Sequence, residues 1–289
     1  MNDVITVGLD GTPESVTAVL WAAQEARLRG DRLRLVHAWA LLAPETSTPA
    51  PGAKDQNYWP HRIMEEASAA VRAHHPDLPL EEVLVPLDPL EALKDAAGTS
   101  GLLVLGSRDL GPLEKYVLGE VGLQLIAHIG TPTVLVRARQ DSASVRGDGD
   151  VVLGLSLHEP CEALLAFAFG TAARRGVPLC AVHGRRLPSH AYNRGGGVDP
   201  IIAKDVVDDA QRGLSEALRP WREKFPDVRV VDRVELESPA RALLRDAADA
   251  GLLVVGRRHK RRLLTPRIGH VVQAVVHHAA CPVAVVPHE

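Results

Sequence analysis

The stretch Val4-Ile5-Thr6-Val7-Gly8-Leu9-Asp10 decides the fold, because the chain contains a second version of it, Asp150-Val151-Val152-Leu153-Gly154-Leu155-Ser156. The two align when positions are shifted by 146, which places Gly8 on Gly154. The same shift carries Trp21 onto Phe167, Gly30 onto Gly176 and Val36-His37 onto Val182-His183. A compact apolar run of this length, bounded by turn residues, predicts a buried strand.

A second matching block lies further along the chain. Gly101-Leu102-Leu103-Val104-Leu105-Gly106 matches Gly251-Leu252-Leu253-Val254-Val255-Gly256 at a shift of 150, which also places Gly119 on Gly269, His128 on His278 and Pro132 on Pro282. Two long collinear blocks indicate a duplication. We therefore expect two domains, residues 1–138 and 150–289. Residues 139–149 join them as a polar, Gly- and Ser-containing linker.

Strands and helices alternate within each copy. In the first copy the pattern predicts strands over residues 4–9, 33–38, 83–87, 102–106 and 133–136, with helices over 13–29, 61–74, 90–97 and 119–128. Alternation of this kind predicts the α/β class: each domain is a five-stranded, mostly parallel, doubly wound (Rossmann-like) sheet with helices on both faces. Ligands of such sheets bind beyond the carboxyl ends of the strands. Pro-containing segments at matched places, 42–60 and 188–200, are expected as loops near that edge.

The composition and the residue spacing limit the classes of partner, location and metal site that we expect. The net charge is −3 with a pI of about 6.5, which gives no reason to expect nucleic acid or an anionic membrane as partner. The N-terminus lacks a signal peptide and no apolar run is long enough to span a bilayer, so we expect a cytoplasmic protein. The three cysteines and the adjacent pairs His74-His75 and His277-His278 do not have metal-ligand spacing, so no metal site is expected.

The segment Gly106-Ser107-Arg108-Asp109-Leu110-Gly111, with Gly119 before a predicted helix, is the first candidate site. Glycines allow the backbone to approach an anion, and free N–H groups at the start of a helix favour negative charge. By itself this pattern is equally consistent with an ordinary turn at the end of a strand.

These segments together resemble the universal stress protein family. The strand end Val7-Gly8-Leu9-Asp10-Gly11-Thr12 is similar to that of the family, as are the final strands over residues 131–136 and 281–286. The family's glycine signature has Gly, two residues, Gly, nine residues, and then Gly followed by Ser or Thr; Gly106 and Gly119 match its first and third glycines.

The resemblance implies a tandem, non-catalytic member that binds ATP, with accompanying Mg²⁺, or AMP. It carries the nucleotide site onto one set of positions: Asp10, Gly11, Ala38, Gly106, Arg108, Asp109, Gly119, Glu120, Val121 and Gly122. It also implies that the two domains pair through their final strands, and it allows a homodimer.

Two residues of the first copy depart from the family pattern. Asp109 replaces the second glycine and Glu120 replaces the hydroxyl residue. A carboxylate 4 Å from a phosphate is repelled by about 4 kcal/mol at an effective dielectric of 20. Since a carboxylate is favoured at a helix N-terminus, Glu120 either takes the place of the phosphate or is an ordinary first-turn acid.

The second copy departs further from the family. Ser156 and Leu157 stand where the first copy has Asp10 and Gly11. His259 and His270 also depart from the glycine signature. Its loop after the fourth strand carries a basic cluster of five side chains: Arg257, Arg258, Lys260, Arg261 and Arg262. Such a run is either a solvated surface or an anion-binding loop; without interleaved aromatic residues it does not favour single-stranded nucleic acid.

Three functions remain open. The first is a stress-response protein that binds or senses an adenine nucleotide through its N-terminal domain. The second is an interaction scaffold that has lost nucleotide binding in both domains. The third, a nucleotide-using enzyme, would need a phosphate motif after the first strand, and Gly11-Thr12-Pro13-Glu14-Ser15 is a poor one. No nucleophile or acid–base motif indicates catalysis, so ATP hydrolysis would be slow and incidental at most.

Overall fold

The computed structural model describes residues 3–39, 58–107, 120–137, 149–158, 161–192, 197–258 and 268–288. The chain divides into two compact units, unit 1 over Met1–Arg146 and unit 2 over Gly147–Glu289. The division falls inside the segment expected as a linker. Each unit is described by itself.

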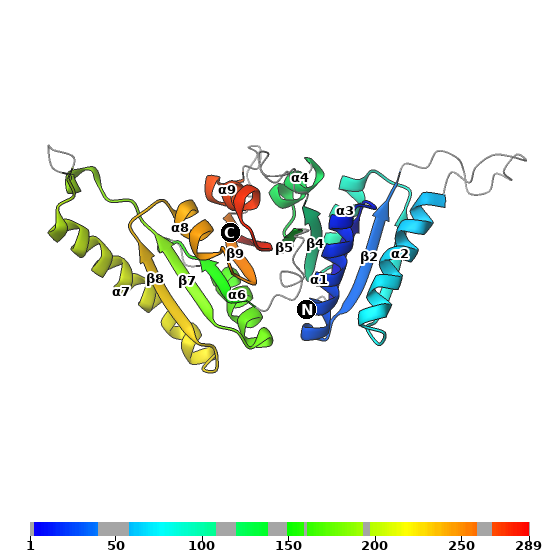
Figure 1. Cartoon of the computed structure of the whole chain (residues 1–289), viewed down its shortest axis with the longest axis horizontal. Coiled ribbons are helices and arrows are strands. Elements are labelled where there is room, and N and C mark those ends of the chain that lie inside the picture. Colours follow the sequence, from blue (N-terminus) through cyan, green and yellow to red (C-terminus); the bar gives the residue numbers. More distant parts are fainter. Residues whose placement is uncertain are drawn as a thin grey trace, which may run out of the picture. The chain divides into compact units, whose positions relative to one another are not determined.

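Unit 1 contains five parallel strands in the order β3-β2-β1-β4-β5. The strands are β1 (Val4–Leu9), β2 (Arg32–Ala38), β3 (Leu80–Val85), β4 (Leu102–Ser107) and β5 (Thr133–Arg137). The helices α1 (Pro13–Arg29) and α2 (Tyr58–His74) pack on one face of the sheet, while α3 (Pro89–Gly98) and α4 (Glu120–His128) lie together on the other (Figure 1).

Unit 2 repeats this arrangement, with strand order β8-β7-β6-β9-β10 and parallel pairing throughout its described strands. The strands are β6 (Val151–Gly154), β7 (Leu179–Gly184), β8 (Val230–Glu235), β9 (Leu252–Arg258) and β10 (Val283–His288). The helices are α6 (Glu162–Arg175), α7 (Pro200–Lys224), α8 (Pro239–Asp246) and α9 (His270–His278). A short 3₁₀ helix, η1 (Ser189–Ala191), precedes α7. The fold class predicted from the sequence is confirmed in both units.

Local chemistry explains where the first helix of each unit ends. In unit 1, Gly30 caps α1 in the left-handed conformation, with φ of 72°, and donates its N–H to the carbonyls of Ala26 and Arg27. In unit 2, Gly176 caps α6 in the same way, with φ of 64°. Glycine adopts this conformation without steric cost, so both helices stop at corresponding residues.

The strand expected over residues 83–87 lies earlier, at Leu80–Val85. It ends before Pro86, which has no N–H to donate to a neighbouring strand. Of the segment expected as a loop over 42–60, residues 42–57 lie outside the described part of the chain. α2 already begins at Tyr58. In the matched segment 188–200, η1 is followed by an isolated bridge between Tyr192 and Val198.

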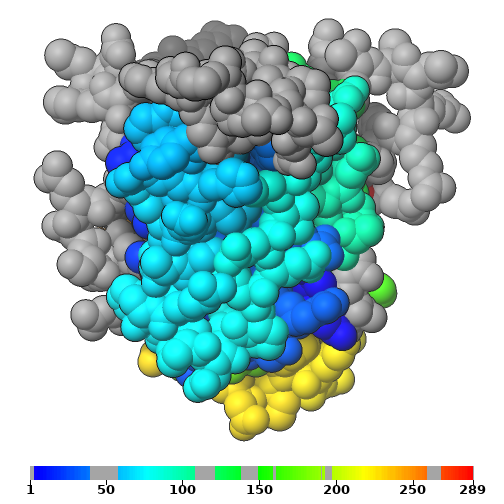
Figure 2. All heavy atoms as spheres, turned by 90° about the vertical axis from the view of Figure 1, so that its right-hand side faces the viewer, coloured from blue at the N-terminus to red at the C-terminus, as the bar shows by residue number. Residues whose placement is uncertain are grey.

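The core consists mainly of aliphatic side chains. Ile5, Leu33, Leu103 and Leu135 of unit 1 are fully buried, and unit 2 has Leu153, Leu165 and Leu179 in the same state. Figure 2 looks onto unit 1 from the side of α2, where α2 and the segment that follows it form the surface facing the viewer. β3 is therefore an edge strand that is partly covered by α2.

Candidate functional site

The strand order of unit 1 reverses between β1 and β4, and most of the predicted site residues with described positions lie at this point. Residue Leu9 is opposite His37 of β2, while Gly8 is opposite Leu105 of β4. Asp10, Gly11, Ala38 and Gly106 therefore gather at one edge of the sheet. In an open doubly wound sheet, the reversal of strand order opens a crevice where ligands bind.

The remaining predicted residues of unit 1 belong to the loop after β4 and to the start of α4. Arg108, Asp109 and Gly119 lie outside the described residues. Glu120 is the first residue of α4, and Val121 and Gly122 follow in its first turn, with Val121 exposed and Gly122 buried.

Asp10 holds the start of α1 in place. Its Oδ1 accepts hydrogen bonds from the backbone N–H of Thr12 at 3.0 Å and from the Thr12 hydroxyl at 2.5 Å. Thr12 is the N-cap of α1 and its Oγ1 accepts from the Ser15 N–H at 3.3 Å. The carboxylate thus stands at the positive end of a helix, where a negative charge is stabilised by about 0.3–1 kcal/mol.

Gly11 occupies a position that only glycine fits. Its φ is +79°, a conformation that side chains with a Cβ rarely adopt. A Cβ at this residue would also lie 2.8 Å from Cδ1 of Ile63 on α2. The turn after β1 is therefore constrained by its own backbone and by the helix that covers it.

Gly106 brings the end of β4 into direct contact with α1. A Cβ at Gly106 would lie 2.7 Å from the carbonyl carbon of Glu14 and 2.8 Å from the backbone nitrogen of Ser15. Backbone meets backbone here, in the first turn of the helix. The absence of a side chain at Gly106 is what allows the amino end of α1 to lie at the reversal of strand order.

The end of β2 presents a backbone edge to the same place. Arg32 donates its N–H to Asp3 on the β1 side, whereas Leu33 and Trp39 donate theirs to Pro79 and Val85 on the β3 side. Successive residues of a strand face opposite neighbours, so the peptide groups of Ala38 face the β1 side. β1 ends opposite His37, and Ala38 lies beyond that end.

Matched histidines occur at this edge in both units. His37 Nδ1 lies 2.8 Å from the carbonyl oxygen of Leu9, and His183 Nδ1 lies 2.9 Å from that of Leu155. A carbonyl oxygen only accepts, so in both rings Nδ1 carries the proton. The sequence match places His37 on His183, and the structure shows that both are buried residues within β2 and β7. Trp39, whose ring lies parallel to that of His37 at 6.4 Å, was missed.

Unit 2 keeps the contact between the first loop and the second helix but reverses its two residues. Gly11 and Ile63 correspond to Leu157 and Gly213, at the shifts of 146 and 150. Leu157 Cδ1 lies 3.3 Å from where a Cβ of Gly213 would be. The large side chain therefore comes from the helix in unit 1 and from the loop in unit 2.

The fourth strand of unit 2 also has different neighbours. Gly256 corresponds to Gly106, but a Cβ there would lie 2.9 Å from Nε2 of His288 and 3.2 Å from Leu164, with no helix backbone among its nearest atoms. α6 begins at Glu162, three residues later than the shift of 146 would place it from Pro13. Its N-cap is Cys161, which makes no side-chain capping hydrogen bond.

Two members of the basic cluster lie among the described residues, at the end of β9. Lys260, Arg261 and Arg262 lie outside the described residues, and Arg258 is exposed at the end of β9. Arg257 is wrong as a loop residue: β9 continues through it, paired in register with Pro287 of β10, and its side chain is only 4% exposed. Burial lowers the pKa of this guanidinium from its usual value.

Buried arginines of the two units stand on opposite members of one strand pair. In unit 1, Ser107 of β4 faces Arg137 of β5, which is 2% exposed. In unit 2, Arg257 of the fourth strand faces Pro287 of the fifth. Each unit thus buries one arginine at this level of the sheet, contributed by a different strand.

Comparisons with known proteins agree with this geometry. The model of the universal stress protein family matches residues 1–137 and again residues 149–287. The chain belongs to the universal stress protein family. A universal stress protein of Mycobacterium tuberculosis (strain H37Rv) is 30% identical over 294 residues, which cover 97% of this chain and 95% of that protein.

Among solved structures, a universal stress protein from Archaeoglobus fulgidus has the same fold along the whole length. Its TM-score is 0.68 at 15% identity, with 100% of both chains covered. Another structure from Archaeoglobus fulgidus, a universal stress protein in complex with dAMP, is 24% identical over 45% of this chain and 94% of that one, with a TM-score of 0.34.

Two further observations, one on membrane spans and one on metal sites, concern only the described residues. Within them, no helix is long and apolar enough to cross a membrane. The same residues contain no group of three or more His, Cys, Asp or Glu side chains that could hold a metal ion.

Proposed function

We propose that this universal stress protein binds an adenine nucleotide, AMP or ATP, in unit 1 and that it does so without catalysing a reaction. The observation that carries the proposal is the meeting of Asp10, Gly11 and the amino end of α1 at the reversal of strand order. An acidic acceptor suits the hydroxyl groups of a nucleoside, and a glycine turn lets a ligand approach the backbone closely.

Each part has a distinct role. The carboxylate of Asp10 accepts hydrogen bonds from ribose hydroxyl groups, which are donors. The peptide groups of Ala38 offer a donor and an acceptor to the edge of the base. Gly106, with the residues that follow it and with Val121 and Gly122 at the start of α4, lies on the phosphate side, where the family resemblance places the phosphates.

Charge at the start of α4 bears on the choice of nucleotide. Glu120 begins that helix, and a carboxylate near a phosphate costs about 4 kcal/mol for unit charges 4 Å apart at an effective dielectric of 20. The triphosphate carries more negative charge than AMP, so we expect AMP to bind more tightly than ATP. Mg²⁺, when it accompanies ATP, offsets part of this repulsion.

The experiment begins with the purified protein, which is denatured so that any released nucleotide can be identified by mass. Calorimetric titration with AMP and ATP then follows, for the wild type and for Glu120→Ser. We expect binding of AMP and a gain in ATP affinity of at least tenfold in the variant. Equal ATP affinities would contradict the role of Glu120. Failure of both nucleotides to bind would leave the scaffold function, with nucleotide binding lost in both units.

The wider role proposed for the protein is a response to stress in the cytoplasm, in which the nucleotide is sensed or carried. No acid–base pair or nucleophile has been placed at the site, so ATP hydrolysis is expected to be slow and incidental at most. Pairing of the two final strands within one chain and assembly of a homodimer, both suggested by the family resemblance, stay predictions.

A further inference from the structure

The turn that receives the ligand in unit 1 is absent from unit 2. Ser156 replaces the acid, and Leu157 replaces the left-handed glycine. Among the described residues, positive φ occurs only at Gly11, Gly30 and Gly176, so Leu157 has an ordinary backbone conformation. The chain after β6 therefore follows a different path from the chain after β1.

Two contacts of unit 2 are made by side chains where unit 1 has other groups. Leu157 packs against Gly213 of α7, where unit 1 has the smaller residue on the loop. The ring of His288 lies against Gly256, where unit 1 has the backbone of the first helical turn. Both are large groups supplied by unit 2 itself, one at each side of the reversal of strand order between β6 and β9.

The start of the helix differs as well. In unit 1 the amino end of α1 is bound by Thr12 and faces Gly106, while α6 starts three residues later with Cys161 as an unbonded N-cap. The backbone of α6 is not among the nearest neighbours of Gly256, so the tip of β9 does not meet a helix end as the tip of β4 does. Unit 2 therefore lacks the acid, the glycine turn and the contact with the helix end, which are the three features that carry the proposed nucleotide site in unit 1.

We infer that unit 2 has lost the features of a nucleotide site, and that the chain binds one nucleotide, in unit 1 alone. The inference rests on the proposed function. It implies that the first half of the duplicated chain responds to nucleotide, whereas the structure of the second half is independent of nucleotide. The duplication has thus been followed by loss of the ligand in the second half, without loss of the packing.

Hydrogen exchange of the full chain with and without saturating AMP tests the inference, since it locates binding without any substitution. We expect slower exchange in peptides over residues 3–15 and 32–38, by at least tenfold for amides that contact the ligand. Peptides over residues 149–158 and 179–184 should be unchanged. Calorimetry on the same sample should give one AMP per chain.

Matched variants give a second readout. Asp10→Ser places in unit 1 the residue that unit 2 has, and we expect it to weaken AMP binding at least tenfold. Ser156→Ala, its counterpart, should leave the affinity unchanged. Slower hydrogen exchange with AMP in both units, or weaker AMP binding by Ser156→Ala, would overturn the inference and leave the proposed function standing. Absence of protection and heat in the wild type would overturn both.

Discussion

Unit 1 and unit 2 make the contact between the first loop and the second helix with the large and the small residue exchanged. The loop after the first strand must contact the second helix, and the pair is Gly11 with Ile63 in one unit and Leu157 with Gly213 in the other. One large and one absent side chain fill a comparable space in either order. Packing therefore constrains the pair as a whole, whereas the proposed ligand site depends on which member is the glycine. The predictions below compare corresponding residues of the two units.

The largest effect is expected from Gly106→Ala, set against Gly256→Ala. At Gly106 the new Cβ meets the rigid backbone of Glu14 at 2.7 Å, whereas at Gly256 it meets the ends of the movable side chains His288 and Leu164. Overpacking against backbone should cost about 2–4 kcal/mol, and against side chains about 1 kcal/mol. Urea unfolding of both variants measures the difference; equal costs would show that the contact between β4 and α1 yields easily.

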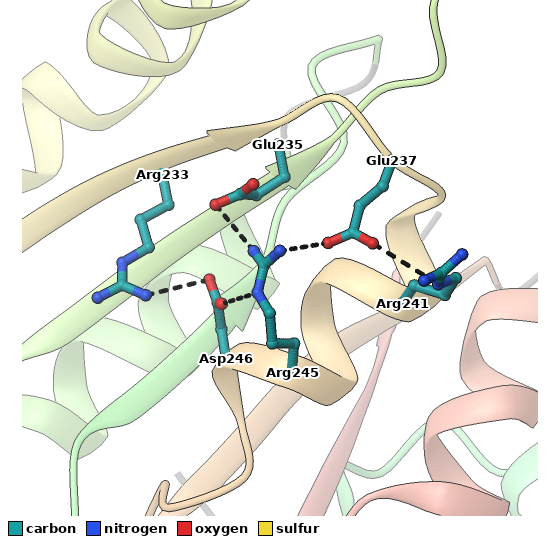
Figure 3. Close-up of polar contacts among 6 residues, drawn as sticks. All are labelled: Arg233, Glu235, Glu237, Arg241, Arg245 and Asp246. Carbon is teal, nitrogen blue, oxygen red and sulfur yellow. Dashed lines mark hydrogen bonds and ion pairs between the residues drawn. The ribbon is translucent and has the colours of Figure 1, made fainter.

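The second prediction concerns an ion-pair network on β8 and α8 (Figure 3). The guanidinium of Arg245 lies 2.8 Å from Glu235, 2.6 Å from Glu237 and 3.0 Å from Asp246, whose side chain is 3% exposed. Arg233 and Arg241 complete the network at 3.5 Å from Asp246 and 3.7 Å from Glu237.

Removal of Arg245 leaves the buried carboxylate of Asp246 with Arg233 alone in this network. Since Arg245 itself is half exposed, we expect Arg245→Ala to lower the free energy of unfolding, but by less than the loss of a fully buried ion pair would. The corresponding residue of unit 1, Asp95, is exposed, and Asp95→Ala should change the stability by less than about 0.5 kcal/mol. Similar costs for the two variants would mean that the network contributes little.

A double-mutant cycle tests whether the exchanged residues of the loop and the helix occupy the same space. Gly213→Ile should destabilise unit 2 by about 1–3 kcal/mol, because Leu157 already fills the space. Adding Leu157→Gly removes the competing side chain, so the double variant should recover at least about 1 kcal/mol relative to the sum of the two changes. Additive costs, measured by urea unfolding, would indicate that these residues do not share one space.

The smallest effect is a pH dependence at Cys180, where the corresponding residue of unit 1 is Arg34. Burial raises the pKa of this thiol from 9.0 to about 11. A raised pKa in the fold stabilises the neutral form, so the contribution is complete below pH 9 and is lost as the pH rises to about 11.

Wild type should therefore lose roughly 1–2 kcal/mol relative to Cys180→Ala over that interval, since one pKa unit corresponds to about 1.4 kcal/mol. A constant difference between wild type and Cys180→Ala from pH 8 to 11 would mean that the thiol ionises normally in the fold.

The sequence predicts the fold well because its signals are local and repeated. The apolar runs, the glycine at the end of each first helix and the shifts of 146 and 150 are all visible along the chain. The exchange between Gly11–Ile63 and Leu157–Gly213 was not predicted, because the two members lie on different elements and correspond at different shifts. Only the spatial contact connects them.

Two other features escaped sequence reasoning for physical reasons. A run of basic residues indicates a solvated surface, yet Arg257 is buried because β10 extends beside it as far as His288. The histidines His37 and His183 match in the sequence, but only the structure shows that each ring donates a hydrogen bond to the end of the neighbouring strand. The end of a strand and the hydrogen-bond partner of a histidine ring both depend on neighbouring strands, which the sequence alone does not show.

The contact at Gly106 has a mechanical consequence. With no side chain between them, the tip of β4 and the first turn of α1 cannot shift independently, so a displacement of one is passed directly to the other. A helix moves largely as a rigid rod, and α1 extends for 17 residues to Arg29. An event at the tip of β4 would therefore reach the opposite edge of the sheet in unit 1, whereas the flexible ring of His288 would absorb it in unit 2.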